Sequence, residues 1–324
     1  MSLGAVLLSS LLATLGHPLA WPVALAGFLV RGGIVVFLLP IVALPSPVGL
    51  SDRIAPTLSA LVLGGATMQL AILFGAICAL AVAVLLLLAW FAAATEAALV
   101  RDAPPWDELD PARPVPPHRR GESGRILSAR LVAHLPLAIV LAWSAVRIVD
   151  AAYRELSRPV DTATPIAVRV VGSLPEVIAL IVVTWVIGQV VGAMAARRIV
   201  LFGSSWAGGL RSAVAECIRR PVQVFVLFTV PVLALLAVLL PTAAATSSTW
   251  DRARIAIGEP VGALEGILTV CAFVGLWLGG LVLVSMVCAW RAAVWTLDAE
   301  QRTFGVSAPV RPGDWSDPEA SGTL

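Results

Sequence analysis

The sequence predicts an all-α polytopic membrane protein, a bundle of about six transmembrane helices. Three observations predict this class. Hydrophobic residues make up 59% of the chain and charged residues only 13%, whereas soluble domains carry about 25% charged residues. The mean hydropathy is +0.94. The 324 residues leave room for about six spans with modest connectors, and for no large soluble catalytic domain besides.

Apolar runs that end at proline or at charged residues define the predicted spans. The first run contains one charge, Arg31, followed by Gly32 and Gly33. In the uncharged stretch that comes next, Gly64 and Gly65 predict a break, so the second span begins near residue 68. The predicted spans cover approximately residues 19–44, 68–98, 131–152, 174–196, 221–240 and 261–290.

These spans form one predicted transmembrane domain, residues 1–300, interrupted by a polar, proline-rich connector at 101–125. The segment 301–324 is predicted to be a disordered tail. The apolar run Leu3–Leu15 lacks the basic flank of a signal peptide, because no lysine or arginine precedes Arg31. We therefore interpret it as a retained helix at the membrane surface.

A weak internal repeat is visible in front of three spans. In each case a segment of helical character ends in a basic residue and then proline: His17-Pro18, His134-Leu135-Pro136 and Arg219-Arg220-Pro221. Proline is well suited to open a helix, because its missing N–H would have no partner there. The pattern predicts three helical hairpins, each introduced by a surface helix. The intervals between the first prolines are 118 and 85 residues, so coincidence remains the alternative.

The placement of arginine predicts the orientation. Six arginines lie in residues 101–130, five in residues 197–220, and further ones follow the last span, whereas the alternate connectors are shorter and less basic. Positive connectors stay in the cytoplasm. We therefore expect a multi-pass protein of a bacterial cytoplasmic membrane with both termini in the cytoplasm.

Composition also excludes several kinds of chemistry. All 22 basic residues are arginine, typical of a GC-rich bacterial genome, so no P-loop lysine or Schiff-base lysine is possible. The four cysteines form no C-x-x-C pair, and the three histidines have no metal-ligand spacing. No hydrolase or nucleotide-binding motif is present. The sequence predicts no catalytic residue, no cofactor, no metal and no nucleic-acid partner.

The candidate site is a cluster of charges inside the membrane. A guanidinium at membrane depth costs about 2.5–3.5 kcal/mol on insertion scales, so Arg31 needs a partner. On helices perpendicular to the membrane, Arg31 and Arg147 would reach mid-depth or beyond, and Glu176 and Glu265 enter their spans from the outer side. We predict a polar cluster of these four residues, with Glu176 as the first partner of Arg31. The alternative is that they are separate structural or interfacial charges.

Glycine forms two spaced pairs within the predicted spans. Gly188 and Gly192, and Gly275 and Gly279, have the spacing that lets helix backbones approach closely, and we expect them to pack spans four and six together. A homodimer contact is the alternative. The glycine- and serine-rich segment 203–209 is expected to be a turn with a helix N-cap, and a phosphate-binding loop is the alternative.

The layout resembles two groups of proteins. The basic residue and proline at His17-Pro18 and Arg220-Pro221 resemble uncharacterised six-span bacterial membrane proteins, including the membrane portion of some glycerophosphodiester phosphodiesterases. Six spans behind a surface helix also resemble export-type ABC transporter membrane subunits. The resemblance lies in layout and implies no site residue, since Glu96-Ala97-Ala98 lacks the glycine spacing of the importer coupling loop.

These observations give three functional hypotheses. The first is a permease-like or helper subunit of a transport system, which would work in the lipid bilayer with a cytoplasmic partner subunit or as a homo-oligomer. The second is a scaffold or lipid-interacting protein without transport activity. The third is a membrane-embedded lipid-modifying enzyme, which the missing motifs disfavour.

Overall fold

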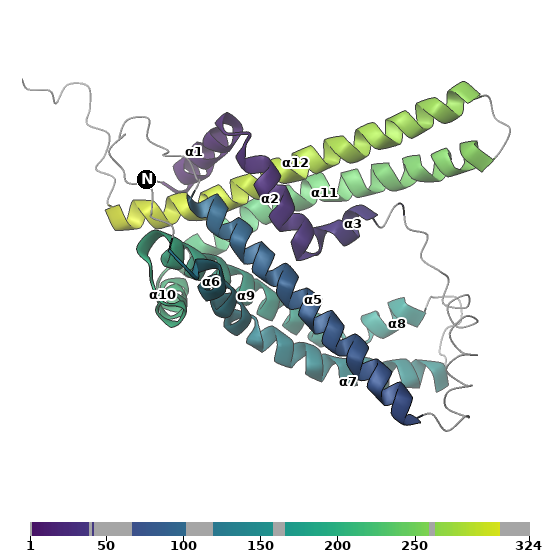
Figure 1. Cartoon of the computed structure of the whole chain (residues 1–324), viewed down its shortest axis with the longest axis horizontal. Helices are drawn as coiled ribbons and strands as arrows, with labels where there is room; N and C mark the ends of the chain where they lie inside the picture. The colour runs from purple at the N-terminus through teal and green to yellow at the C-terminus, as the bar shows by residue number, and fades with distance from the viewer. Residues whose placement is uncertain are drawn as a thin grey trace, which may run out of the picture.

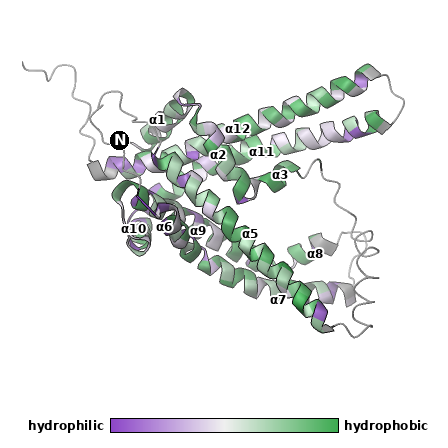
Figure 2. Cartoon of the chain, in the orientation of Figure 1, coloured by the Kyte–Doolittle hydropathy of each residue, from purple (hydrophilic) through white to green (hydrophobic). Residues whose placement is uncertain are grey.

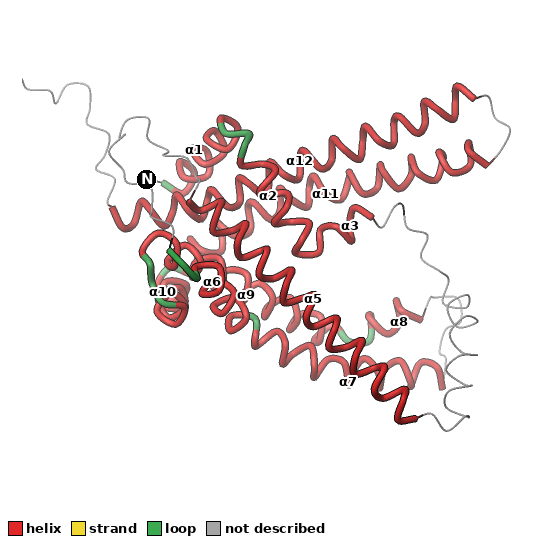
Figure 3. The backbone as a smooth tube through the Cα atoms, in the orientation of Figure 1, coloured by secondary structure: helices red, strands yellow, loops and turns green. Residues whose placement is uncertain are grey.

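The computed structural model describes residues 2–38, 41, 67–101, 119–157, 166–258 and 263–304, and all regular secondary structure in these ranges is helical (Figures 1 and 3). Six helices of this part are long and apolar enough to cross a membrane. The prediction of an all-α polytopic bundle is confirmed. The candidate spans are Ala20–Leu38, Met68–Arg101, Leu135–Glu155, Pro175–Phe202, Pro221–Ile257 and Leu264–Gln301.

The chain is arranged as three similar units. In the described residues each has a short helix followed by two spans, but the first span of the first unit is broken and the second unit has an extra short helix, α8 (Ile166–Gly172), between its spans. The short helices are α1 (Leu3–Gly16), α6 (Glu122–Ala133) and α10 (Trp206–Arg219). The first spans are α2 (Ala20–Phe28) with its continuation, α7 (Leu135–Ser157) and α11 (Pro221–Gly258); the second spans are α5 (Thr67–Arg101), α9 (Pro175–Phe202) and α12 (Ala263–Phe304). The three short helices lie at one end of the bundle, here called the surface-helix end (Figure 1).

Local sequence explains the junctions at this end. Ser205 caps α10 by accepting a hydrogen bond from the Gly208 N–H at 3.1 Å. Gly203 ends α9 with φ +67°, a left-handed conformation that favours glycine. Segment 203–209 is therefore a turn with an N-cap, the first of its two expected interpretations. At the N-terminus, Ser2 caps α1 through the Ala5 N–H at 3.3 Å.

The described helices differ from the predicted spans at their ends. Residues 131–133 belong to α6, and the third span starts only after His134. We expected the fifth span to end at Leu240, but α11 continues through Pro241 because proline is tolerated inside membrane helices. Helix α12 continues past Trp290 because its next residues, including Val294 and Trp295, are packed in the core.

The first span is broken next to its charge. A π-helical turn, η1 (Leu29–Gly33), separates α2 from α3 (Ile34–Leu38), and Gly32 has φ +103° within it. Figure 1 shows α2 crossing α12 at a steep angle. A helix in this orientation advances less along the other spans than its own length, which decides where Arg31 lies.

The core is concentrated at the surface-helix end. Its buried cluster draws residues from α1, α5, α6, α9, α10, α11 and α12. Many of them are alanines that let helices approach closely, such as Ala93, Ala129 and Ala195, each 0% exposed. Elsewhere α5 and α7 present exposed leucine, isoleucine, valine and phenylalanine, and Figure 2 colours most of α5 as hydrophobic. Apolar faces of this extent indicate a lipid bilayer environment.

Candidate functional site: a buried glutamate between arginines

Glu96 is buried at the centre of a charge cluster whose arginines range from the buried Arg197 to the partly exposed Arg31. Glu96 lies on α5, five residues before the helix ends at Arg101, and is 4% exposed. Arg31 Nη2 donates to its Oε2 at 3.1 Å, and Arg130 Nε donates to the same oxygen at 2.7 Å. Arg197 Nη1 donates to Oε1 at 2.5 Å. One carboxylate thus binds three guanidinium groups, from η1, α6 and α9.

Backbone carbonyls fix two of these arginines further. Arg31 Nη2 also donates to the carbonyl of Ala92 at 3.1 Å. Arg197 donates to the carbonyl of Ala193 on its own helix at 2.9 Å and to that of Ala292 on α12 at 3.3 Å. Arg197 therefore ties α9 to both α5 and α12. Buried charges are tolerated when they are bonded in this way.

A fourth arginine, Arg291, lies beside the cluster on α12. Its guanidinium carbon is 5.8 Å from the centroid of the Phe228 ring. It has no ion pair within 4.0 Å among the described residues. Arginine is always charged in proteins. Arg291 is therefore a cation without a direct ion pair in the described chain, and Glu96 acts on it only from beyond 4.0 Å.

These five charged residues line a cavity of about 270 Å³. Among the described lining residues, four are arginines and one is acidic, which gives the wall a formal charge of +3. Two lining residues, Arg197 and Trp295, also carry buried donors, Nε and Nε1, that meet no acceptor in the described part of the chain. A site with surplus positive charge is suited to an acceptor-rich anion.

His134 contacts two residues of the cavity lining, Arg130 and Gln189. Its Nδ1 lies 2.8 Å from the Arg130 carbonyl, which can only accept, so Nδ1 carries a proton. Its Nε2 accepts from Gln189, a cavity-lining residue, at 3.3 Å. Burial lowers the pKa of His134 from its usual value, and the charges of Arg130 and Arg31 lower it further. The neutral form is therefore favoured in the folded protein.

The four charges predicted to form one cluster do not meet. Arg31 is in the site, but its partner is Glu96 and not Glu176. Glu176 lies 3.7 Å from Arg147, and both side chains are about half exposed, at 56% and 46%. Glu265 is exposed near the start of α12, at the opposite end of the bundle. The depth assigned to Arg31 assumed a helix perpendicular to the membrane, and the steep crossing of α2 removes that assumption.

The glycine prediction is also corrected. Gly188 and Gly192 on α9 pack against the junction of α6 and α7, where an added Cβ at Gly188 would lie 2.9 Å from His134 Cδ2 and 3.1 Å from the Ala133 carbonyl oxygen. An added Cβ at Gly275 or Gly279 would meet no described atom within 4 Å. The two pairs therefore do not join spans four and six, because they face different surroundings.

Four residues of the site were missed in the sequence: Glu96, Arg130, Arg197 and Arg291. One signal was available, since Glu96 is the only acidic residue in the predicted span 68–98. The three arginines were counted only for orientation, because each lies at or beyond the end of a predicted span. The described chain shows no group of three or more histidine, cysteine or acidic side chains that could hold a metal ion.

Comparison of the chain with protein-family models, with curated proteins and with solved structures gives no match. The resemblance in layout to six-span bacterial proteins and to transporter subunits therefore stays a prediction. The function has to be inferred from the geometry and charge of the site.

Proposed function

We propose that the protein binds a phosphate-bearing anion in the arginine-lined cavity at the surface-helix end. The observation that carries this proposal is the charge of the lining, four arginines against one glutamate. Arginine recognises phosphate through paired, charge-assisted hydrogen bonds. Glu96 holds three guanidinium groups in place, and the unpaired Arg291 supplies charge that a ligand can neutralise.

A purely structural role explains the site less well. A cluster that only ties helices together would be most stable with balanced charge, because surplus buried charge is costly. Here the surplus arginine lines a cavity, and two further lining residues, Arg197 and Trp295, each carry a buried N–H group without an acceptor in the described chain. These features favour a ligand-binding protein over a scaffold without a ligand.

A permease-like role is the second candidate, and the break in the first span favours it. Arg31 sits in the π-helical turn, next to Gly32 with its φ of +103°. Such a turn gives a helix a hinge at a functional position. Movement of α3 relative to α2 would move Arg31 with respect to Glu96. Phosphate flux into proteoliposomes that is lost in the Gly32→Ala variant would support this role.

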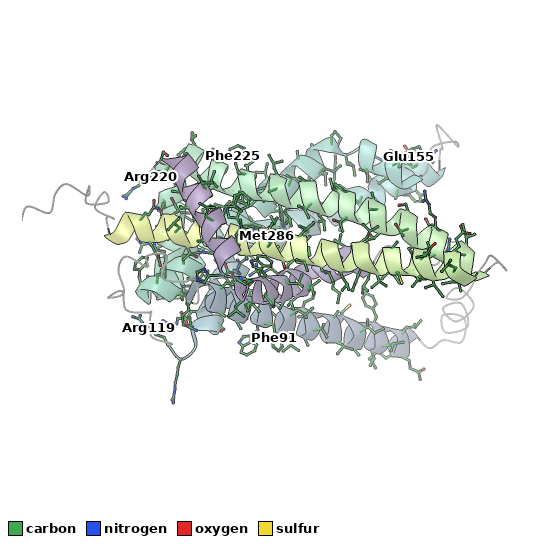
Figure 4. The ribbon with its side chains drawn as sticks, turned by 90° about the horizontal axis from the view of Figure 1, so that it is seen from above. Phe91, Arg119, Glu155, Arg220, Phe225 and Met286 are labelled. Carbon is green, nitrogen blue, oxygen red and sulfur yellow. The ribbon has the colours of Figure 1, made fainter. Side chains whose placement is uncertain are left out.

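The orientation remains part of the proposal. If the arginine-rich connectors are cytoplasmic, the cavity lies near the cytoplasmic face of a bacterial plasma membrane. Figure 4 labels Arg119 and Arg220 at the surface-helix end and Glu155 at the opposite end. On that face the cavity would be within reach of a cytoplasmic partner subunit or of a second copy of the chain.

Thermal unfolding in a neutral detergent at constant ionic strength tests the proposal. Inorganic phosphate, glycerol phosphate and short-chain phosphatidic acid are each added to the full-length protein. A ligand present at 100 times its Kd stabilises the folded state by about 2.7 kcal/mol. At least one compound should stabilise the wild type and lose this effect in Arg291→Gln. If none stabilises the wild type more than this variant, the proposal fails.

Arg211→Gln is the matched control. Arg211 is exposed on α10 at the same end of the bundle and does not line the cavity. Its replacement removes one positive charge without changing the site. Equal loss of stabilisation in Arg211→Gln and Arg291→Gln would mean that general surface charge, and not the cavity, attracts the anion.

A further inference from the structure

We infer that the anion is the headgroup of a membrane phospholipid that enters the cavity from the adjoining leaflet, with its phosphate at the arginines and an acyl chain along the apolar wall. This inference rests on the proposed function and names the class of its ligand. Three features of the site support it: the depth of the arginines, the two-part lining of the cavity and the exposure of its apolar rim.

The arginines lie near the ends of candidate spans, where lipid headgroups are expected. Glu96 and Arg197 are each five residues from the ends of α5 and α9 at the surface-helix end, or ~8 Å along a helix. The polar zone of a bilayer is about 5–8 Å thick on each side. Arg130 belongs to α6, which is not one of the candidate spans, so a helix at the membrane surface contributes directly to the site.

The cavity has an apolar wall besides the charged one. Val232, Leu235 and Leu236 of α11 line it, together with Phe28 of α2. These α11 residues follow Phe228, the ring beside Arg291, by four to eight residues, which places them about 6–12 Å deeper along the helix. A free phosphate would use only the arginines, whereas a lipid uses both walls.

The apolar rim faces the membrane. Leu236 is 41% exposed and Trp185 is 39% exposed, and both line the cavity. They lie on the candidate spans α11 and α9, whose exposed surfaces are apolar. A lipid could therefore enter sideways between α9 and α11 while its chain stays in hydrocarbon.

The formal charge of the lining favours a phosphate monoester. A monoester carries about −1.5 to −2 at neutral pH, closer to the +3 of the wall than the single negative charge of a diester. Zwitterionic lipids bring a cation that the arginines would repel. The expected order of affinity is phosphatidic acid, then phosphatidylglycerol, then phosphatidylcholine.

The test compares lipids with their soluble headgroup on the full-length protein in neutral detergent. Wild-type protein is titrated with short-chain phosphatidic acid, phosphatidylglycerol, phosphatidylcholine and glycerol phosphate, and binding is followed by thermal shift. We expect phosphatidic acid to bind at least tenfold more tightly than glycerol phosphate. Arg291→Gln should weaken the binding of phosphatidic acid at least tenfold, and Arg211→Gln should change this affinity by less than twofold.

A second variant separates the two walls. Leu236→Trp adds bulk at the partly exposed rim, where folding is tolerant, and obstructs the apolar wall. Leu236→Trp should weaken the binding of phosphatidic acid at least fivefold and leave the affinity for glycerol phosphate unchanged. If glycerol phosphate binds the wild type as tightly as phosphatidic acid, or if Leu236→Trp has no effect, the lipid inference is overturned while anion binding stands. If no phosphate compound binds, both proposals fall.

Discussion

The two ends of the bundle hold their charges in different ways. At the surface-helix end, Glu96 is buried and binds three arginines from three helices. At the opposite end the described pairs are single, and they range from the exposed Arg147 with Glu176 to the partly buried Arg169 with Glu155. Burial explains the difference. A charge removed from water needs several bonds to compensate for lost hydration, whereas an exposed charge keeps its water and gains little from a partner.

The contrast between the ends shows which charges are structural and which are available for function. Glu176 lies in the first turn of α9, so its exposed pair with Arg147 lies near the start of that candidate span. The buried cluster has more positive charge than its glutamate neutralises, so it carries an imbalance that packing alone does not require. Matched substitutions at the two ends test this difference.

The largest expected effect follows removal of the central charge. Glu96→Gln leaves the buried guanidinium of Arg197 and the largely buried one of Arg130 without a counter-charge, which should lower the free energy of unfolding by about 3–5 kcal/mol. Glu176→Gln breaks only an exposed pair and should change it by about 0–1 kcal/mol. Thermal unfolding in detergent measures both. Similar losses in the two variants would remove the distinction between the ends.

Glycine substitutions should differ in the same direction. In Gly188→Ala the new methyl group meets His134 Cδ2 and the Ala133 carbonyl oxygen, and overpacking of this kind costs about 1–3 kcal/mol. Gly275→Ala meets no described atom and should gain up to about 1 kcal/mol from higher helix propensity. Chemical unfolding of both variants provides the measurement. Destabilisation by Gly275→Ala would indicate that this face packs against another chain.

Gly32 should tolerate substitution poorly. Its φ of +103° is a left-handed conformation that an L side chain reaches only with strain, of about 1–2 kcal/mol. Gly32→Ala should therefore lower the unfolding temperature, although an added Cβ would find open space. Gly75→Ala, in the regular helix α5 and equally unobstructed, is the control. Equal stability of the two variants would argue against a strained turn beside Arg31.

The smallest effect concerns pH. Because burial lowers the pKa of His134, the unfolded chain binds a proton more readily than the folded protein just below pH 6.5. The contribution of His134 to stability should be constant above about pH 6.5 and fall below it, by less than ~1 kcal/mol since the ring is partly exposed. Unfolding temperatures between pH 5 and 8 measure this, and His134→Gln should flatten the profile where the exposed His17→Gln does not.

Much of the fold could be predicted from the sequence, because hydropathy and helix capping depend on local residues. The apolar runs located the six candidate spans. The basic residues that precede Pro18, Pro136 and Pro221 marked the three junctions after the short helices. Orientation in the membrane stays a prediction from the arginines.

The site could be predicted from the sequence only in part. Arg31 was found because a lone guanidinium in an apolar run requires a partner. The partner was not found, because it depends on the steep crossing of α2 and on a contact between Arg31 and Glu96, which are 65 residues apart in sequence. Such contacts have no local signal. The glycine spacing in α12 was uninformative for a similar reason, since the pattern does not say what lies opposite it.

Native mass spectrometry of the protein purified from membranes tests the central claim most directly. If the arginine-lined cavity holds a phospholipid, the wild type and Arg211→Gln should each retain one adduct of phospholipid mass, and Arg291→Gln should lose it. An adduct kept equally by Arg291→Gln, or a wild-type protein that carries none, would contradict the claim.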